Sequence, residues 1–178
     1  AHSEVGFVEG EDDDVVWEQH EIELGLAPLP EAGEAVALTR WVLGNLARRD
    51  RLRIRFDPVL RRGHAGTGLH FHFATVKDGK PQPVRTAAGG LTPAAEWLVG
   101  GLLELGAALM VFGNRDEGSF VRLGQAREAP NSIIWGEYDR SALIRLPFVP
   151  TDAQGRSVAA PTVEFRLPAG APACECRG

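Results

Sequence analysis

Cysteine, net positive charge and long apolar runs are all scarce in this sequence. Its two cysteines, Cys174 and Cys176, stand in the terminal segment CECRG, too few and too close together for the disulfide framework of a small secreted protein. They leave open a soft-metal site or a solvated tail. The formal net charge is -5, which argues against a nucleic-acid-binding protein, because affinity for a phosphate backbone rests on clustered lysine and arginine.

No segment resembles a leader or a membrane span. The first residues lack a basic stretch followed by an apolar run, which a signal peptide requires. The longest apolar stretch, 97–112, contains Glu104 and is shorter than the ~20 residues that cross a bilayer. With 44% hydrophobic and 24% charged residues among 178, the chain is typical of a globular protein with one core. We expect a soluble, cytoplasmic protein without a membrane partner.

What the sequence does contain is a glycine-rich turn that leads into an alternating strand at 63–73, GHAGTGLHFHF. Alternation places His70 and His72 on one face of the strand and apolar side chains on the other. The preceding glycines allow a ligand to approach the main chain closely. Two interpretations stay open: a pair of imidazoles built for a ligand or metal, or an amphipathic strand whose polar face carries histidine.

Three further segments alternate in the same way, and each presents a polar pair. They are 21–24 with Glu21 and Glu23, 52–56 with Arg53 and Arg55, and 163–167 with Glu164 and Arg166. Four such strands predict one sheet with its chemically active residues on one face and helices on the other. Carboxylates together with one or two imidazoles suit Mg²⁺ or Mn²⁺ and leave positions for phosphate oxygens.

Helical patterns flank these strands. An apolar stripe predicts a helix over 31–49. Thr92 as N-cap, followed by Pro93, predicts a second helix over 92–112, whose all-round apolarity indicates the centre of the core. Asp78 and Gly79 predict a turn or hairpin. The segment 114–147 is predicted to be mostly irregular, and its arginines either bind an anionic substrate or lie at the surface.

Taken in order, these pieces resemble the catalytic domain of glutamine synthetase. The resemblance rests on Glu4 in HSEV, QHEI at 19–22, GTGLHFH at 66–72, the helix at 92–114, SFVRL at 119–123, EAP at 128–130, DRSA at 139–142, IRLP at 144–147 and VEFRLP at 163–168. It covers nearly the whole chain, so we expect a partial catalytic domain over 1–168 and a tail over 169–178. It implies an α+β fold in which a curved, mostly antiparallel sheet has helices packed on its outer face.

The resemblance also implies an activity. In this family ATP phosphorylates the side-chain carboxylate of glutamate, and ammonia then captures the γ-glutamyl phosphate. A chain of this kind is expected to act as a carboxylate–amine ligase on glutamate or a related amino acid, with ammonia or another amine as acceptor. Its cofactor would be Mg²⁺ or Mn²⁺, and its full-length form would be a homo-oligomeric ring.

Residue roles follow from the matching positions. The implied metal ligands are Glu4, Glu21, His70 and Glu164. The implied nucleotide-binding residues are His72, Arg140 and Arg145. The implied substrate-binding residues are Gly66, Arg122 and Arg166. The implied catalytic residues are Glu128, Arg140 and Arg122. Among these, Glu128 matches a flap carboxylate that closes the site and helps to deprotonate the attacking ammonium.

Three substitutions depart from the family pattern. Ala65 replaces an asparagine that contacts glutamate, Ala74 replaces a serine, and Thr162 replaces a nucleotide-binding arginine. The family's N-terminal β-grasp domain, an early pair of metal-binding glutamates and the long C-terminal helical part have no counterpart in this sequence. We therefore expect a fragment or a much reduced relative, with little or no turnover by itself.

Two alternatives remain beside the ligase. One is a catalytically inactive relative that serves as a structural or oligomerising protein. The other is a two-metal hydrolase of unrelated fold, with Glu21, His70 and Glu164 as metal ligands.

Overall fold

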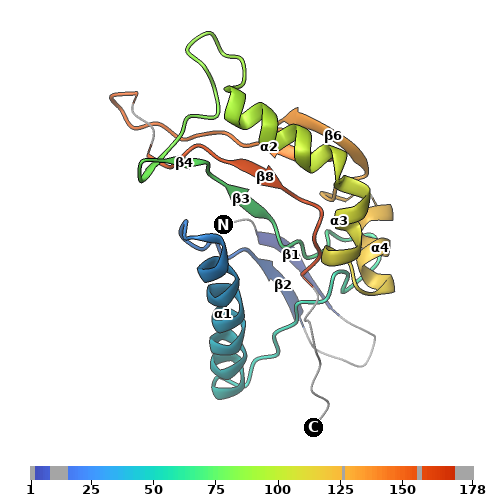
Figure 1. Cartoon of the computed structure of the whole chain (residues 1–178). Helices are drawn as coiled ribbons and strands as arrows, with labels where there is room; N and C mark the ends of the chain where they lie inside the picture. Colours follow the sequence, from blue (N-terminus) through green and yellow to red (C-terminus); the bar gives the residue numbers. More distant parts are fainter. Residues whose placement is uncertain (1–2, 9–15, 126, 156–157, 171–178) are drawn as a thin grey trace. The chain divides into compact units, whose positions relative to one another are not determined.

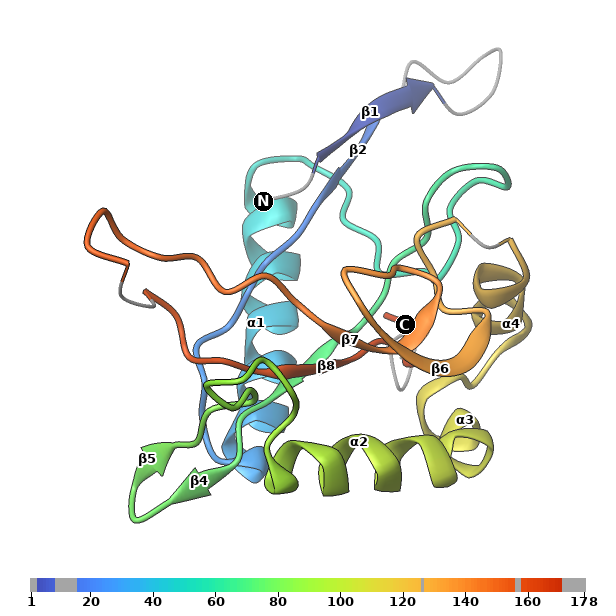
Figure 2. The same cartoon turned by 90° about the horizontal axis from the view of Figure 1, so that it is seen from above.

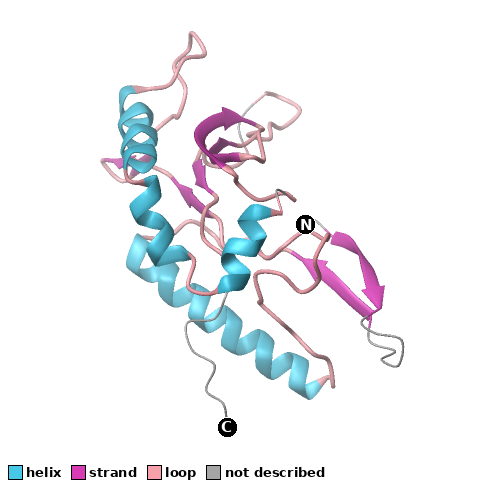
Figure 3. Cartoon of the chain, turned by 90° about the vertical axis from the view of Figure 1, so that its right-hand side faces the viewer, coloured by secondary structure: helices cyan, strands magenta, loops and turns pink. Residues whose placement is uncertain are grey.

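The computed structural model describes residues 3–8, 16–125, 127–155 and 158–170. The chain forms two compact units, Ala1–Ile54 and Arg55–Gly178, and each has its own secondary structure. Figure 1 follows the elements of both units along the chain. Figure 3 separates the helices and strands from the long loops that connect them.

The first unit contains a pair of strands and one long helix. β1 (Ser3–Val8) pairs antiparallel with β2 (Val16–His20). α1 (Leu29–Arg49) confirms the helix predicted over 31–49, and Glu31 in its first turn and Arg48 and Arg49 in its last turn complement the helix dipole. No residue of α1 is fully buried.

Two predicted strands, 21–24 and 52–56, are wrong, because both segments lack regular structure. β2 ends at His20, which pairs with Ser3 at the start of β1. Ile22 is 57% exposed. Alternating residues form a strand only where a neighbour supplies hydrogen bonds, and no described strand lies beside these two segments.

The second unit is built on a four-stranded sheet in the order β3-β8-β7-β6. β3 (Phe71–Phe73), β8 (Val163–Phe165) and β7 (Ala142–Leu146) pair antiparallel in turn, and β6 (Ser132–Glu137) runs parallel to β7. The strands predicted at 69–73 and 163–167 are therefore present in shorter form. Seen from above, β7 and β8 lie side by side (Figure 2).

The strand register determines which side chains meet on this sheet. His72 lies opposite Glu164, and Glu164 lies opposite Arg145. The adjacent row is apolar and consists of Phe71, Phe165 and Ile144. Because successive side chains of a strand point to opposite faces, the sheet has one polar face and one apolar face at this point.

The apolar face belongs to the core. α2 (Pro93–Glu104) lies along the sheet (Figure 1), and its Val99 packs in the same buried cluster as Ile144 and Phe165. Full burial of such a side chain contributes roughly 1.5–3 kcal/mol. The predicted start of this helix is confirmed, since the Thr92 hydroxyl accepts the N–H of Ala95 at 3.4 Å. The result is an α+β fold, as predicted.

The helix predicted over 92–112 is two helices. α3 (Gly106–Gly113) begins where α2 ends, and the two are bent by 72°. Gly106 is buried, and a Cβ there would lie 2.9 Å from Leu143 Cδ2, so the bend brings the backbone into close contact with β7. Val111 and Phe112 are 74% and 76% exposed, so the prediction that the whole segment lies in the core is wrong.

Among the described residues, no single helix is long and apolar enough to cross a membrane. The bent pair of α2 and α3 passes that test of length and composition only when its two members are taken together.

The segment 114–147 was predicted to be mostly irregular, which is also wrong. It contains α4 (Glu117–Gly124) as well as β6 and β7. Asp116 caps α4, since its carboxylate accepts the backbone N–H of Ser119 at 2.7 Å. These elements are too short for their apolar periodicity to stand out from a loop.

The turn predicted at Asp78 and Gly79 is confirmed. It joins β4 (Val76–Lys77) to β5 (Lys80–Pro81). Both turn residues have positive φ, 51° and 74°, which is the conformation that a two-residue hairpin turn requires and that Asp-Gly tolerates.

Candidate functional site

Glu164 on β8 is the centre of the polar cluster, and its side chain is fully buried. Arg145, on the neighbouring strand β7, donates to both carboxylate oxygens, at 3.1 Å from Nη2 to Oε1 and through Nε to Oε2. Arg166, two residues along β8, donates from Nη1 to Oε1 at 2.8 Å. The Nδ1 atom of His70 lies 3.1 Å from Oε1, and Nε2 of His72 lies 3.9 Å from it.

These contacts keep Glu164 ionised. Burial alone would raise the pKa of its carboxyl, but the hydrogen bond with His70 and the charges and hydrogen bonds of Arg166 and Arg145 outweigh burial and lower the pKa from 4.5 to about 2. For the His70 ring burial dominates and lowers the pKa, although the hydrogen bond with Glu164 acts in the opposite direction. At neutral pH the cluster therefore contains an anionic carboxylate and a neutral imidazole.

Arg122 on α4 lies behind this cluster and is 2% exposed. Its Nη1 donates to the carbonyl oxygens of Leu167 and Pro168 at 3.2 and 3.3 Å, and its Nη2 donates to that of Arg166 at 3.3 Å. The same Nη2 lies 3.4 Å from Nε2 of His70. Burial, together with the charge of Arg166, lowers the pKa of Arg122 to about 10, so it remains charged at neutral pH.

The cluster therefore carries a net positive charge. It combines the single carboxylate of Glu164 with the guanidiniums of Arg145 and Arg166, which pair with it, and of Arg122, which lies against the His70 ring. A group of this composition attracts an anion such as a carboxylate or phosphate. Arg145 is the most accessible of the three, with 23% of its side chain exposed against 2% for Arg166.

The glycines of the 63–70 turn make room for Arg122 and His70. A Cβ on Gly66 would overlap the carbonyl oxygen of Pro58 and lie 2.9 Å from Arg122 Cγ. A Cβ on Gly68 would lie 2.6 Å from Arg122 Nη2 and would overlap the His70 ring. The Pro58 carbonyl, Arg122 and His70 thus occupy the space beside Gly66 and Gly68, whereas nothing lies within 4 Å of a Cβ on Gly63. The expectation that a ligand approaches the main chain along this turn stays a prediction.

Glu128 and Arg140 form a second, more exposed pair beside the cluster. Their side chains make an ion pair and are 39% and 49% exposed. Glu128 has a positive φ of 56°, and its carbonyl oxygen accepts a hydrogen bond from Arg166 Nη2 at 2.8 Å. That bond connects the loop of Glu128 directly to the centre of the cluster.

Most of the predicted site residues thus lie close together in the second unit. They are Gly66, His70, His72, Arg122, Glu128, Arg140, Arg145, Glu164 and Arg166. The two others, Glu4 and Glu21, belong to the first unit. Glu4 lies in β1, and Glu21 is exposed after the end of β2. Their participation in a metal site stays a prediction.

Thr162 is a member of the site that the sequence identified only as a departure from the family pattern. Its hydroxyl lies 3.1 Å from Nδ1 of His72, and it precedes β8 by one residue. Its position in the sequence could have indicated this role, because Thr162 stands two residues before Glu164 and shares its face in an extended segment.

A divalent metal finds two donors of suitable chemistry in the second unit. Nδ1 of His70 and Oε1 of Glu164 are 3.1 Å apart, and an imidazole with a carboxylate suits Mn²⁺ or Mg²⁺. Within the ranges that the structure describes, no three histidine, cysteine, aspartate or glutamate side chains gather to hold an ion. The pair therefore fits a metal whose remaining ligands come from elsewhere.

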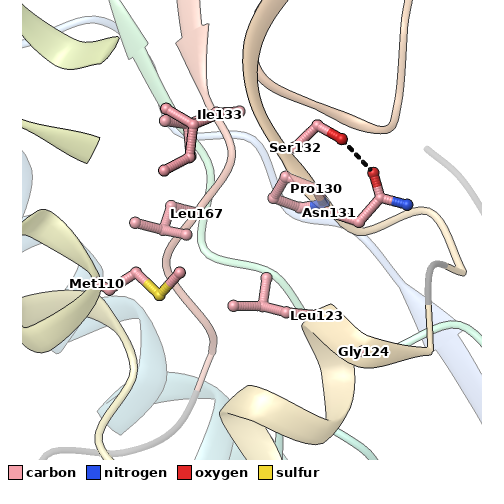
Figure 4. Close-up of a pocket in the computed structure, with 9 residues that line it drawn as sticks. Met110, Leu123, Gly124, Pro130, Asn131, Ser132, Ile133 and Leu167 are labelled. Carbon is pink, nitrogen blue, oxygen red and sulfur yellow. Dashed lines mark hydrogen bonds between the residues drawn. The ribbon is translucent and has the colours of Figure 1, made fainter. Parts of the chain in front are cut away.

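An apolar pocket of about 320 Å³ lies apart from these residues. Figure 4 shows Met110, Leu123, Ile133 and Leu167 around it. On one side the hydroxyl of Ser132 donates to the side chain of a neighbouring asparagine at 3.0 Å. None of the predicted site residues lines this pocket.

Comparison with known proteins agrees with the fold and with the order of the motifs. A sequence model of the family "Glutamine synthetase, catalytic domain" matches residues 5–174. Glutamine synthetase of Frankia alni is 33% identical over 153 residues, which are 84% of this chain and 31% of the relative. That of Thermus thermophilus is 33% identical over 147 residues, 80% of this chain and 32% of the relative.

A solved structure supports the same fold. The cryo-EM structure of Plasmodium falciparum glutamine synthetase superimposes with a TM-score of 0.68 at 22% identity, covering 79% of this chain and 27% of that one. This rules out the unrelated fold on which the hydrolase alternative depended. The chain spans about a third of the length of the curated relatives that it matches. It belongs to the glutamine synthetase family.

Proposed function

We propose that this chain forms part of the active site of an ATP-dependent carboxylate–amine ligase of the glutamine synthetase type. Glutamate or a related amino acid would be phosphorylated on its side-chain carboxylate, and ammonia or another amine would displace the phosphate from the γ-glutamyl phosphate. The observation that carries the proposal is the row of His72, Glu164 and Arg145 across three adjacent strands, backed by further arginines. Transfer of a phosphoryl group between two anions needs such positive charge.

The exposed fractions of the arginine side chains suggest that these arginines have different roles. Arg140 and Arg145 are partly exposed and are available to bind nucleotide phosphates and the transferring group. Arg122 and Arg166 are each 2% exposed, so in the proposed site they support the cluster from behind. The predicted contact of Arg122, Arg166 and Gly66 with glutamate stays a prediction and would require this region to open.

His70 and Glu164 are the residues that would hold Mg²⁺ or Mn²⁺, with Glu4 and Glu21 as further proposed ligands. When bound, such an ion neutralises phosphate charge. His72, which contacts Thr162 through Nδ1, is proposed to contact the nucleotide.

Glu128 is proposed to take the proton from the attacking ammonium. Its carboxylate is 39% exposed and paired with Arg140, so it lies at the accessible edge of the cluster. The loop that carries it would shield the acyl phosphate from water, which otherwise hydrolyses it.

The proposal requires that the rest of the complete enzyme contributes to this active site. Because the chain spans about a third of its relatives' length, we propose a partial catalytic domain over 1–168 with a tail over 169–178. We further propose that the complete protein is a homo-oligomeric ring and that the 178-residue chain alone turns over poorly.

A thermal-shift titration tests ligand binding. MgCl₂ or MnCl₂ together with a non-hydrolysable ATP analogue should raise the melting temperature of the wild-type chain. His70→Ala should abolish that shift, and Glu164→Gln should do so at a temperature where this variant is still folded. His20→Ala is the matched control, since His20 is exposed and should leave the shift intact. A wild-type chain that shows no ligand-dependent shift contradicts the proposal.

A second candidate, an inactive structural relative, is favoured by one observation. Hydrogen bonds from Arg145 and Arg166 already occupy the carboxylate of Glu164, which leaves fewer free lone pairs for a metal. A complete protein that assembles into a ring but neither binds ATP nor forms γ-glutamyl hydroxamate from glutamine and hydroxylamine would establish this alternative. Robust glutamine synthesis by the 178-residue chain would instead refute its proposed incompleteness.

A further inference from the structure

α1, the helix of the first unit (Figure 1), exposes its larger apolar side chains to solvent. Leu38 and Trp41 are 61% and 67% exposed, and Val42 and Leu46 are 39% and 40% exposed. Their spacing of three or four residues places all four on one stripe of the helix. By contrast, small residues are prominent among its half-buried positions, which include Ala32, Ala35, Gly44 and Ala47. An exposed apolar stripe of this kind is typical of an interaction surface.

Charged residues continue the same stripe at both ends of α1. Glu31 and Glu34 come before its apolar part, and Arg48 and Arg49 come directly after it. Each of the four is three, four or seven residues from a member of the stripe, so they lie on the same face, and all four are exposed. Arg49 pairs with Asp50 at 2.8 Å, but no described residue forms an ion pair with Glu31, Glu34 or Arg48. The face is therefore acidic at its start, apolar in its middle and basic at its end.

A face with this order of charges is complementary to itself when two helices run antiparallel. With a two-fold axis at the middle of the helix, Glu31 of one copy lies opposite Arg49 of the other, and Leu38 lies opposite Val42. The axis repeats each contact, so every favourable pair occurs twice. A parallel pair would instead set glutamate beside glutamate and arginine beside arginine, which repel each other.

We propose that this face of α1, from Glu31 to Arg49, binds the same face of a second copy of the chain in an antiparallel pair. The self-complementary charges are the reason for choosing a second copy as the partner. A helix of 21 residues is ~31 Å long, so the contact is small for a stable dimer and the expected dissociation constant is micromolar. The pair does not depend on the proposed ligase activity, and it adds a two-fold contact to the proposed ring.

Sedimentation velocity on the 178-residue chain tests whether the pair forms. Between about 5 µM and about 200 µM the wild-type chain should change from monomer to dimer, as a micromolar dissociation constant requires. An increase of NaCl from about 0.05 M to about 0.5 M should weaken the dimer several-fold, because salt screens exposed charges. A chain that stays monomeric at the highest concentration and the lowest salt would overturn the proposal.

Charge reversal at the two ends tests the antiparallel arrangement. One variant combines Glu31→Arg with Glu34→Arg and is basic at both ends, and the other combines Arg48→Glu with Arg49→Glu and is acidic at both ends. Each variant alone should dimerise about tenfold more weakly than the wild-type chain, since like charges then meet twice. An equal mixture of the two should recover a dimer with one copy of each. If the mixture associates no better than its components, the proposal fails.

Trp41→Ala tests the apolar part of the face without changing any charge at the helix ends. It should weaken the dimer about tenfold or more, because a tryptophan at the centre of an interface carries much of the binding energy. Trp97→Ala is the matched control, since Trp97 is also exposed, at 77%, but lies on α2, and it should leave the dimer unchanged. Alanine favours helix, so this pair still decides if a charge-reversed variant does not fold, as circular dichroism would reveal. Equal effects of the two substitutions would overturn the proposal.

Discussion

Replacement of Glu164 by glutamine should destabilise the second unit far more than an ordinary loss of a surface ion pair. The side chain is fully buried, and Arg166, which pairs with it at 2.8 Å, is only 2% exposed. Glutamine preserves the size of the side chain but leaves the buried guanidinium without a counter-ion. Removal of one partner of a buried ion pair costs about 3–5 kcal/mol.

The pKa of Glu164 provides a second, independent value for the stability that its carboxylate contributes. Lowering this pKa from 4.5 to about 2 corresponds to about 3 kcal/mol of stability at neutral pH, since a tenfold change in proton affinity is about 1.4 kcal/mol. Because the folded-state pKa is the lower one, this stability is present above pH 4.5 and is lost as the pH falls from about 4.5 to about 2. We expect the pH dependence in this window to be much weaker in the Glu164→Gln variant.

Native-state hydrogen exchange of peptides that contain β7 and β8 measures this effect within the second unit. The matched control is Glu137→Gln, since Glu137 also pairs with an arginine, Arg85, at 2.7 Å, but is 47% exposed. Loss of that surface pair should cost at most about 1 kcal/mol. If Glu164→Gln costs no more than Glu137→Gln at pH 7, the reasoning from buried charge is refuted.

Three further sets of substitutions have expected effects on the free energy of unfolding, which urea denaturation can measure. Gly66→Ala should lower the free energy of unfolding by about 1–3 kcal/mol, because the new Cβ would overlap the carbonyl of Pro58. Gly100→Ala is its control: a Cβ there meets no atom within 4 Å in α2, so this variant should be more stable by about 0.5–1 kcal/mol. Equal effects of the two substitutions would contradict the packing argument. Asp116→Ala should lower the free energy of unfolding by about 1 kcal/mol through loss of the α4 N-cap. An unchanged midpoint of the urea transition would show that the cap is dispensable. Glu128→Gly should be more stable than Glu128→Ala by about 1 kcal/mol, because alanine keeps the strain of the positive φ; the reverse order would contradict that strain.

The failures of sequence reasoning concern elements that depend on distant partners. The alternating segments 21–24 and 52–56 have the pattern of strands, but none of the described strands pairs with them. The helix over 92–112 divides at Leu105 because Gly106 packs against Leu143, a residue far along the chain. In each case a non-local contact decided the outcome that local periodicity left open.

The functional interpretation depended on both the sequence and the structure. Motif order alone indicated the glutamine synthetase family, which the comparisons then showed. The same motifs assigned a substrate-binding and catalytic role to Arg122, but only the structure reveals that this side chain is buried against three carbonyl oxygens and the His70 ring. No spacing in the sequence indicates how deeply a charged residue lies.

By itself, the sequence determined the features that arise from neighbouring residues: the helix over 31–49, which the structure extends to Leu29–Arg49, the Thr92 cap, the Asp-Gly hairpin and the motifs that indicate the family. Only the tertiary structure decided that Glu164 lies between His72 and Arg145 and that Glu128 is tied to the cluster through Arg166. Caps and turns form within a few residues of chain, whereas strand register and burial are set by contacts between segments that lie far apart in the sequence.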